Sequence, residues 1–161
     1  MQKVVTCLGF NNQAEEAIDF YTSTIPNSKW LTRTRAGDGS PIPKGSLLAA
    51  TFLLDGEEFM ALNGGPPFTF SIGMSIMIKC ETQEEIDHLW EKLSEGGQKV
   101  QCGWLTDRFG VSWQIVPRIL PALLSDPDPG RAANVMQAML KMTKLDIAKL
   151  KGAREQTVSA G

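Results

Sequence analysis

CGWLTDRFGVSWQIVP (Cys102–Pro117) holds two tryptophans, a cysteine and an acidic residue. A stretch of this kind is either an active centre or the closing strand of a core. Its last part, Gly110–Val116 (GVSWQIV), matches Gly56–Leu62 (GEEFMAL), and the two segments lie 54 residues apart. An internal repeat constrains the whole fold, so it is stronger evidence for the architecture than any single motif. The stretch is therefore interpreted first as the closing strand of the second of two similar modules.

The first module is predicted from the segments that come before Gly56–Leu62 in the sequence. The β-branched, apolar run Lys3–Phe10 predicts a strand. Asn12, with Glu15 three positions later, is typical of a helix start. A further strand is expected at 29–35, and Asp55-Gly56 joins two apolar runs as a hairpin turn would. One face of the predicted helix is formed by Ala17, Phe20, Tyr21 and Thr24.

The same order of elements returns after NGGPPF (Asn63–Phe68), which is expected to link the modules. The alternative is a loop whose glycines let the backbone approach a ligand. Ile72–Cys80 predicts a strand. Thr82 and Glu85 repeat the spacing of Asn12 and Glu15, a capping box that starts a helix, and Gly96-Gly97 ends this second helix. The face of that helix is formed by Ile86, Leu89, Trp90 and Leu93.

A helical segment follows the second module. Asp128 and Pro129 predict the start of a helix, and Asp146 predicts the cap of a last short helix. A stripe of apolar residues on the first of these helices is expected to pack against the sheet or a partner subunit. The alternative is an adaptable, methionine-rich binding surface. The stripe consists of Val135, Met136, Met139 and Leu140.

These elements predict an α+β fold of two tandem β-α-β-β-β modules with a short C-terminal helical tail. Module one is expected at 1–63, a linker at 64–70, module two at 71–117 and the tail at 118–154. We expect residues 1–161 to form one domain, because a chain of this length can bury a core of its own.

The composition excludes several classes of protein. A net charge of −2 gives no basic surface for nucleic acid. No apolar run approaches the roughly 20 residues of a membrane-spanning helix, so no membrane partner is expected. Cys7, Cys80 and Cys102 are odd in number and form no C-x-x-C pair, which predicts a reduced, cytoplasmic protein. Cys7 and Cys80 are expected to be buried as small apolar side chains.

Long motifs in the chain resemble the vicinal oxygen chelate superfamily, which includes glyoxalase I and bleomycin-resistance proteins. Within it, the chain is most similar to the PhnB-like branch, also called demethylubiquinone methyltransferase-like. The resemblance implies a glyoxalase/bleomycin-resistance/dioxygenase-like fold and a homodimer. The motifs are QAEEAIDFYTSTIPNSK, FMALNGGPPFTF, CETQEEIDHLWEKLSEGG, the opening stretch and the tail segment AMLKMTKLDIAKL.

The resemblance also implies where a metal would bind. Enzymes of the superfamily hold a divalent metal with His, Glu or Gln side chains, and the four positions carry over to Thr6, Met60, Ser75 and Gln114. Divalent metals need imidazole, thiolate or carboxylate ligands, and Gln114 supplies the one plausible oxygen. A register shift of one residue would bring in neighbours such as Cys7, which give no better set. We therefore expect no metal and no other cofactor.

The sequence also bears on methyl transfer and on catalysis by a cysteine or an aspartate. Methyl transfer from S-adenosylmethionine is not favoured, because no glycine-rich loop follows the first strand. Cys102 is a candidate nucleophile, although no histidine stands near it, and its alternative role is packing beside Gly103. Asp107 is a weak candidate for a general base, and its alternative role is to shape the turn TDRFG.

Three functions therefore stay open. The first is a metal-free protein that binds a small hydrophobic or aromatic ligand on the concave face of its sheet. The second is a metal-independent lyase or isomerase that uses Asp107 or Cys102. The third is a structural or regulatory dimer whose pocket is filled by side chains. Strand alternation directs Trp113 and Ile115 to the helices. The predicted pocket lining is Leu8, Phe10, Met60, Leu62, Trp104, Gln114 and Val116.

Overall fold

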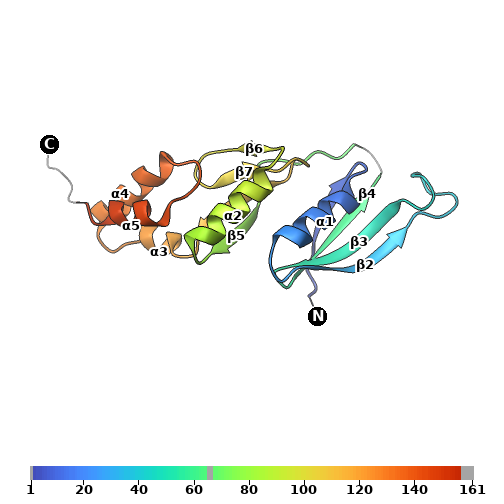
Figure 1. The fold of residues 1–161 in the computed structure, drawn as a ribbon, viewed down its shortest axis with the longest axis horizontal. Helices are drawn as coiled ribbons and strands as arrows, with labels where there is room; N and C mark the ends of the chain where they lie inside the picture. Colours follow the sequence, from blue (N-terminus) through green and yellow to red (C-terminus); the bar gives the residue numbers. More distant parts are fainter. Residues whose placement is uncertain (1, 65–66, 157–161) are drawn as a thin grey trace. The chain divides into compact units, whose positions relative to one another are not determined.

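The chain folds into two units, residues 1–69 and 70–161. The structure is a computed structural model that describes residues 2–64 and 67–156. Each unit contains a four-stranded sheet with a helix packed on it (Figure 1). None of the helices in the described part of the chain is long and apolar enough to cross a membrane.

The first unit has the predicted β-α-β-β-β order. Its elements are β1 (Thr6–Phe10), α1 (Ala14–Thr24), β2 (Lys29–Arg35), β3 (Leu47–Leu54) and β4 (Glu57–Asn63). The strands lie in the order β1-β4-β3-β2, and β1 runs parallel to β4.

The second unit repeats this topology. Its module contains β5 (Ile76–Cys80), α2 (Gln83–Ser94), β6 (Gln98–Lys99), β7 (Trp104–Thr106) and β8 (Ser112–Pro117). The strands lie in the order β5-β8-β7-β6, and β5 runs parallel to β8. The α+β fold with two tandem β-α-β-β-β modules is thus confirmed. The predicted strand at Ile72–Cys80 is shorter than expected, since β5 begins at Ile76.

Three helices follow β8, namely α3 (Leu120–Leu124), α4 (Pro129–Leu140) and α5 (Ile147–Arg154). The predicted caps are confirmed, because Asp128 accepts hydrogen bonds from two backbone N–H groups of α4, and Asp146 accepts one from α5. The predicted apolar stripe of α4 is only partly buried. Val135 is fully buried, whereas Met136 and Leu140 are exposed.

The hairpin between β3 and β4 turns at Asp55-Gly56, as predicted. Both residues have a positive φ, 48° at Asp55 and 81° at Gly56. A two-residue turn of this kind requires left-handed backbone at both positions, which Asp and Gly tolerate. The turn also sets the antiparallel register in which Phe52 lies opposite Phe59.

The start of α1 differs from the prediction. Asn12 does not cap it, since the N-cap residue is Gln13, which forms no side-chain capping bond. Instead, Asn63 at the end of β4 accepts a hydrogen bond from the Ala14 backbone N–H at 2.9 Å. The same side chain donates to the Leu47 carbonyl at 3.1 Å, and it is buried. A long-range amide therefore ties the helix to the sheet, which no local pattern signals.

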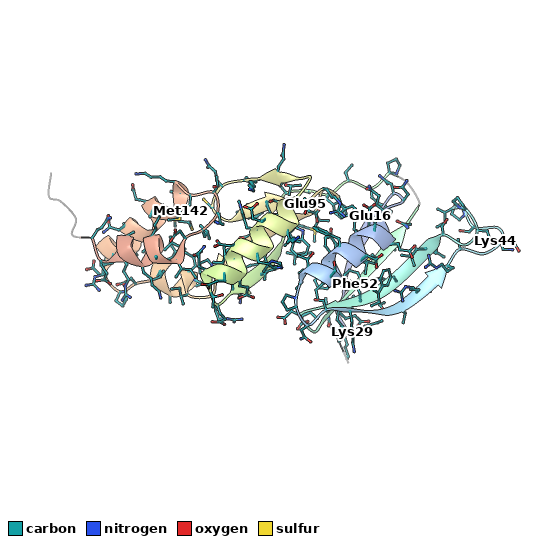
Figure 2. The ribbon with its side chains drawn as sticks, viewed as in Figure 1. Glu16, Lys29, Lys44, Phe52, Glu95 and Met142 are labelled. Atoms are coloured by element: carbon teal, nitrogen blue, oxygen red, sulfur yellow. The ribbon has the colours of Figure 1, made fainter. Side chains whose placement is uncertain are left out.

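Strand register assigns each side chain of the first unit to one of two faces. The helix side holds Phe52, which is fully buried between β3 and α1 (Figure 2), and Ala61 of β4. Leu8 pairs with Ala61, so it shares this face. We call the opposite side of each sheet, which its helix does not cover, the open face. Cys7 and Met60 are register partners on the open face.

Replacing Asn63 tests this tie. Asn63→Ala should lower the free energy of unfolding by about 1–3 kcal/mol, because it removes a helix cap and leaves a buried carbonyl unpaired. Chemical denaturation followed by circular dichroism measures the change. Asn12→Ala is the control, and its effect should stay within about 0.5 kcal/mol. Equal losses in the two variants would contradict the assignment of the cap to Asn63.

Candidate functional site

The closing strand β8 separates a buried side from a polar one. Trp113 and Ile115 have no exposed surface, and β8 packs against α2, as predicted. Gln114, between them, points to the open face. Register places Trp104 of β7 and Met77 of β5 on either side of Gln114 on that face. The open face of the second unit therefore combines an aromatic ring, a thioether and an amide.

A groove of about 380 Å³ lies on this unit beside Trp104. Its wall is mostly apolar, and it includes two predicted candidates, Trp104 and Cys102. Ile72 and the segment 100–101 were missed, because they lie outside the strands, where alternation predicts nothing, whereas Leu105, Thr106 and Ser112 lie on β7 and β8. The lining consists of Ile72, Val100, Gln101, Cys102, Trp104, Leu105, Thr106 and Ser112.

A polar pair lies on the same face. The Gln114 Nε2 atom donates a hydrogen bond to the Ser75 Oγ atom at 2.9 Å. Both residues are only partly buried. The pair thus leaves polar atoms within reach of solvent next to Trp104, which is the register partner of Gln114.

Several predicted pocket residues lie elsewhere. Leu8 and Phe10 are buried on the helix side of the first sheet, since they pair with Ala61 and Asn63. Their predicted place on the concave face was wrong by one residue of register, and such a shift moves a side chain to the other face. Met60 belongs to the open face, as expected.

The first unit presents a second apolar stretch on its open face. Leu62 lies two residues after Met60 and therefore points to the same side. Its register partner Gly9 is covered by a ring, because a Cβ atom built on Gly9 would lie 3.0 Å from Phe68. Phe68 itself is held by Asn11, which accepts a hydrogen bond from the Phe68 N–H at 2.7 Å.

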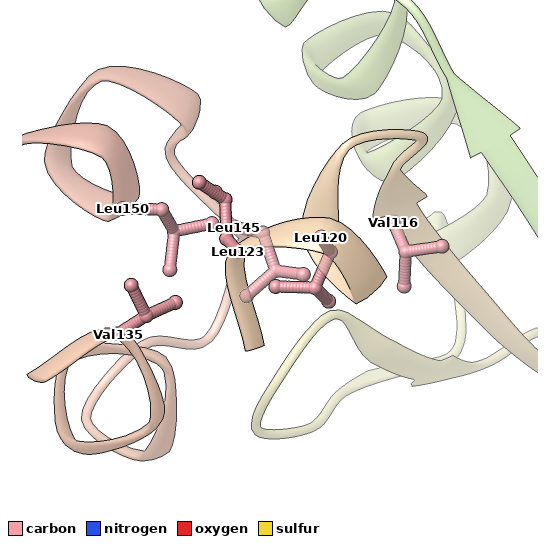
Figure 3. Close-up of a cluster of buried hydrophobic side chains, with 6 residues drawn as sticks. All are labelled: Val116, Leu120, Leu123, Val135, Leu145 and Leu150. Atoms are coloured by element: carbon pink, nitrogen blue, oxygen red, sulfur yellow. The ribbon is translucent and has the colours of Figure 1, made fainter. Parts of the chain in front are cut away.

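Val116 is not part of an accessible pocket, which corrects its predicted role. It is on the same side of β8 as Gln114 but is buried in an apolar cluster with the tail. The partners in this cluster are leucines and a valine that follow the sheet in sequence (Figure 3). They are Leu120, Leu123, Val135, Leu145 and Leu150.

The positions inherited from metal-binding relatives do not fit a metal. Thr6 pairs with Phe59 on the helix side, so the open-face position of β1 is Cys7. Cys7 and Met60 then offer a thiol and a thioether, while Ser75 and Gln114 offer a hydroxyl and an amide. This donor set contains one thiol but lacks the imidazole and carboxylate groups that would complete a site for iron, nickel or zinc. Within residues 2–64 and 67–156, no group of three or more His, Cys, Asp or Glu side chains is placed to bind a metal ion.

Cys102 is held by the tail. It has a positive φ of 60°, and its backbone N–H donates to the Met142 carbonyl at 2.9 Å. Its thiol donates to the Met139 carbonyl at 3.6 Å. These contacts fit the predicted alternative, a packed cysteine beside Gly103, and they place the sulfur atom at the edge of the groove.

Asp107 shapes the turn before β8. It is buried, and its Oδ1 atom accepts hydrogen bonds from the backbone N–H groups of Phe109 and Val111 at 2.8 and 3.0 Å. Its Oδ2 atom accepts a third from Trp113 Nε1 at 2.8 Å. Both carboxylate oxygens are therefore engaged in holding the turn and the core tryptophan. This geometry supports the structural reading of Asp107.

The other two cysteines differ from each other. Cys80 is buried, as predicted, and desolvation with the nearby Glu85 and Glu81 carboxylates raises the pKa of its thiol to about 12. Cys7 was expected to be buried but is exposed on the open face of the first unit. The expectation failed because Cys7 points away from α1, whereas its neighbour Leu8 points toward the helix and is buried.

The sequence and the fold identify the family. The family model described as 3-demethylubiquinone-9 3-methyltransferase matches residues 2–116. The chain belongs to this family. A comparison with curated proteins found no match.

Solved structures agree with membership in this PhnB-like family. A PhnB protein from Bacillus cereus, described by the same methyltransferase name, is 38% identical, with 72% of this chain and 99% of that chain covered at a TM-score of 0.68. A protein from Pseudomonas aeruginosa is 26% identical, with 73% and 98% covered at a TM-score of 0.62. The resemblance to the PhnB-like branch is thus confirmed at the level of the family.

A more distant structure shares the fold alone. The fosfomycin resistance protein FosX of Listeria monocytogenes, solved with Mn(II) and sulfate, is 15% identical, with 71% of this chain and 89% of that chain covered at a TM-score of 0.53. The manganese is a property of FosX.

The structural role of Asp107 can be tested by removing its charge. Asp107→Asn should lower the free energy of unfolding by about 2 kcal/mol, because an amide cannot accept all three hydrogen bonds that the carboxylate accepts. Thermal unfolding followed by circular dichroism measures this loss, and the tryptophan fluorescence, to which Trp113 contributes, should shift with it. Asp38→Asn, at an exposed loop position, is the control. An Asp107→Asn variant as stable as the wild type would contradict the structural assignment.

Proposed function

We propose that the protein binds a small hydrophobic or aromatic molecule, without a metal, in the groove beside Trp104. The observation that carries this proposal is that Trp104 is only partly buried beside a groove of about 380 Å³, while Trp113 on the other face is fully packed. A dimer whose pocket is filled by side chains would not leave this space open. The filled-pocket alternative is therefore not favoured.

The chemistry of the lining supports this ligand class. Ile72 and Val100 expose 78% and 43% of their surface, so an apolar ligand that covers them would gain free energy from the buried apolar area. Trp104 offers a flat surface on which a planar ring can stack. Gln114 and Ser75 on the same face supply the few polar atoms that such sites use to orient a ligand.

Catalytic alternatives gain no support from the candidate residues. Asp107 is engaged at both oxygens in the turn, so it is not poised as a base. Cys102 donates to a backbone carbonyl of the tail. The methyltransferase activity in the family description is also not favoured, since β1 leads into α1 through Asn11–Gln13, which is not a glycine-rich loop. We therefore propose binding as the function and a reduced, cytoplasmic setting for a chain with three free cysteines.

The test uses 8-anilinonaphthalene-1-sulfonate, an amphiphilic aromatic probe. At 100 times its dissociation constant the probe should stabilise the protein by about 2.7 kcal/mol. Trp104→Ala should weaken binding about tenfold, which corresponds to about 1.4 kcal/mol of lost stacking and burial. Isothermal titration measures both affinities, with and without divalent metal.

Trp30→Ala is the matched control, because it removes a tryptophan from the edge strand of the first unit, far from Trp104 in sequence. It should leave probe affinity unchanged. Gln114→Ala is expected to weaken binding by removing the polar neighbour of Trp104. Probe affinity that is insensitive to both Trp104→Ala and Gln114→Ala would refute this site. A thermal shift with metal alone would instead revive a metal-dependent function.

We also propose a homodimer that covers the exposed apolar residues of the second unit. Met74 and Met77 expose 74% and 47% of their surface, close in sequence to Ile72. Isolated exposed residues are ordinary, but several large ones close together in sequence favour an interface. A second copy of the chain is the partner that the family resemblance implies.

Sedimentation tests this assembly. The wild type should sediment as a dimer, and Met74→Glu should shift it to a monomer, because a charge cannot be buried unpaired in an apolar interface. Leu140→Glu is the control, since Leu140 is exposed on the tail helix α4. A wild-type monomer, or equal effects of the two substitutions, would contradict the proposed interface.

A further inference from the structure

The tail lies beyond the part of the chain that the family model matches, although its segment AMLKMTKLDIAKL was among the motifs of the resemblance. The family model ends at Val116, and the Bacillus cereus protein is covered over 99% of its length by only 72% of this chain. Helices α3, α4 and α5 all begin after that point. Their role must therefore be inferred from what they contact in this chain.

The tail is anchored to β8 by a buried apolar cluster (Figure 3). Val135, Leu145 and Leu150 have no exposed surface, and they pack with Val116 of the strand. Leu145 belongs to the segment between α4 and α5. A Cβ atom built on Gly103 would lie 2.9 Å from its Cδ1 atom, so this segment lies directly against the loop between β6 and β7.

Polar contacts fix the same segment to α2. The side chain of Gln83 donates to the Leu145 carbonyl at 3.1 Å and accepts from the Ile147 N–H at 2.8 Å. Lys144 forms an ion pair with Asp87 at 2.9 Å. Hydrogen bonds from Gln83 and, to a smaller extent, from Lys144 lower the pKa of Asp87. This carboxylate therefore stays charged at neutral pH.

The segment in turn holds the loop that carries Cys102. The N–H groups of Cys102 and Gly103 donate to the carbonyls of Met142 and Thr143 at 2.9 and 2.8 Å. Met142 marks this segment in Figure 2. Cys102 and Gly103 both have positive φ, 60° and 82°, because they are the two central residues of a tight turn in which the Trp104 N–H donates to the Gln101 carbonyl at 3.1 Å. The tail contacts hold this turn from outside.

The same loop forms one wall of the groove. Val100, Gln101 and Cys102 are three consecutive lining residues, and Trp104 follows them on β7. One side of this loop therefore bonds to the tail while the other side faces the proposed ligand.

We propose that the C-terminal tail is a positioning element for the ligand groove, with Leu145 as its central positioning residue. The inference rests on the proposed binding function, because it assigns the tail a role in that same site. Leu145 and Gln83 hold the segment 141–146, and this segment holds Val100–Gly103 in the conformation that shapes the groove. Ligand affinity thus depends on residues that do not touch the ligand.

The test uses the full chain in a Cys7→Ser background, in which Cys80 is buried with a raised pKa and Cys102 is the thiol that reports on the loop. Leu145→Ala should speed labelling of Cys102 by N-ethylmaleimide at least tenfold and weaken binding of 8-anilinonaphthalene-1-sulfonate about tenfold. Leu145→Met should restore both values, because its volume is similar. If Leu145→Ala does not fold, Gln83→Ala tests the same anchor more gently and should shift both values in the same direction.

Leu93→Ala is the matched control, since it removes an equally buried leucine from α2. It should lower stability and leave both the labelling rate and the affinity unchanged. An unchanged labelling rate in Leu145→Ala and Gln83→Ala overturns the proposal, and so does faster labelling with unchanged affinity. If the wild type does not bind the probe at all, the proposed function fails. The labelling rate then still decides whether the tail holds the loop.

Discussion

The parallel pairing between the first and last strands of each module is the constraint on which the rest of the structure depends. In the first unit it places Leu8 beside Ala61 under α1, and it leaves Cys7 beside Met60 on the open face. In the second unit it places Met77 beside Gln114. Because side chains alternate along a strand, one residue of register decides whether a group belongs to the core or to a site. The chemistry available on each open face follows from this pairing.

The second unit adds a further constraint around β8. Asp107 gathers three hydrogen bonds at the turn, which positions Trp113 in the core and Gln114 on the opposite face. The buried carboxylate is thus an organising group for the strand. The tail then covers Val116 at the far end of the same strand and leaves the region around Trp104 open. Both the sheet, which carries Trp104, and the tail, which covers Val116, therefore set the extent of the site.

Membership in the PhnB-like family is compatible with several chemistries, because a shared fold does not determine a reaction. The residues of this chain favour binding over catalysis. Its open faces carry thioether, thiol, amide and hydroxyl groups. Its one buried acid near the site, Asp107, is engaged in structure. The groove beside Trp104 and the tail beyond residue 116 are the features of this chain on which the two proposals rest.

The sequence by itself determined the repeated β-α-β-β-β topology, the Asp55-Gly56 turn and the caps of α4 and α5, because these depend on local periodicity and on residues a few positions apart. It also placed Trp113 and Ile115 in the core. Only the tertiary structure decided that Asn63 rather than Asn12 caps α1, and that Leu8 and Phe10 face the helix. It also decided that the tail buries Val116. These outcomes depend on pairing between residues distant in sequence, and local patterns do not encode register across a sheet.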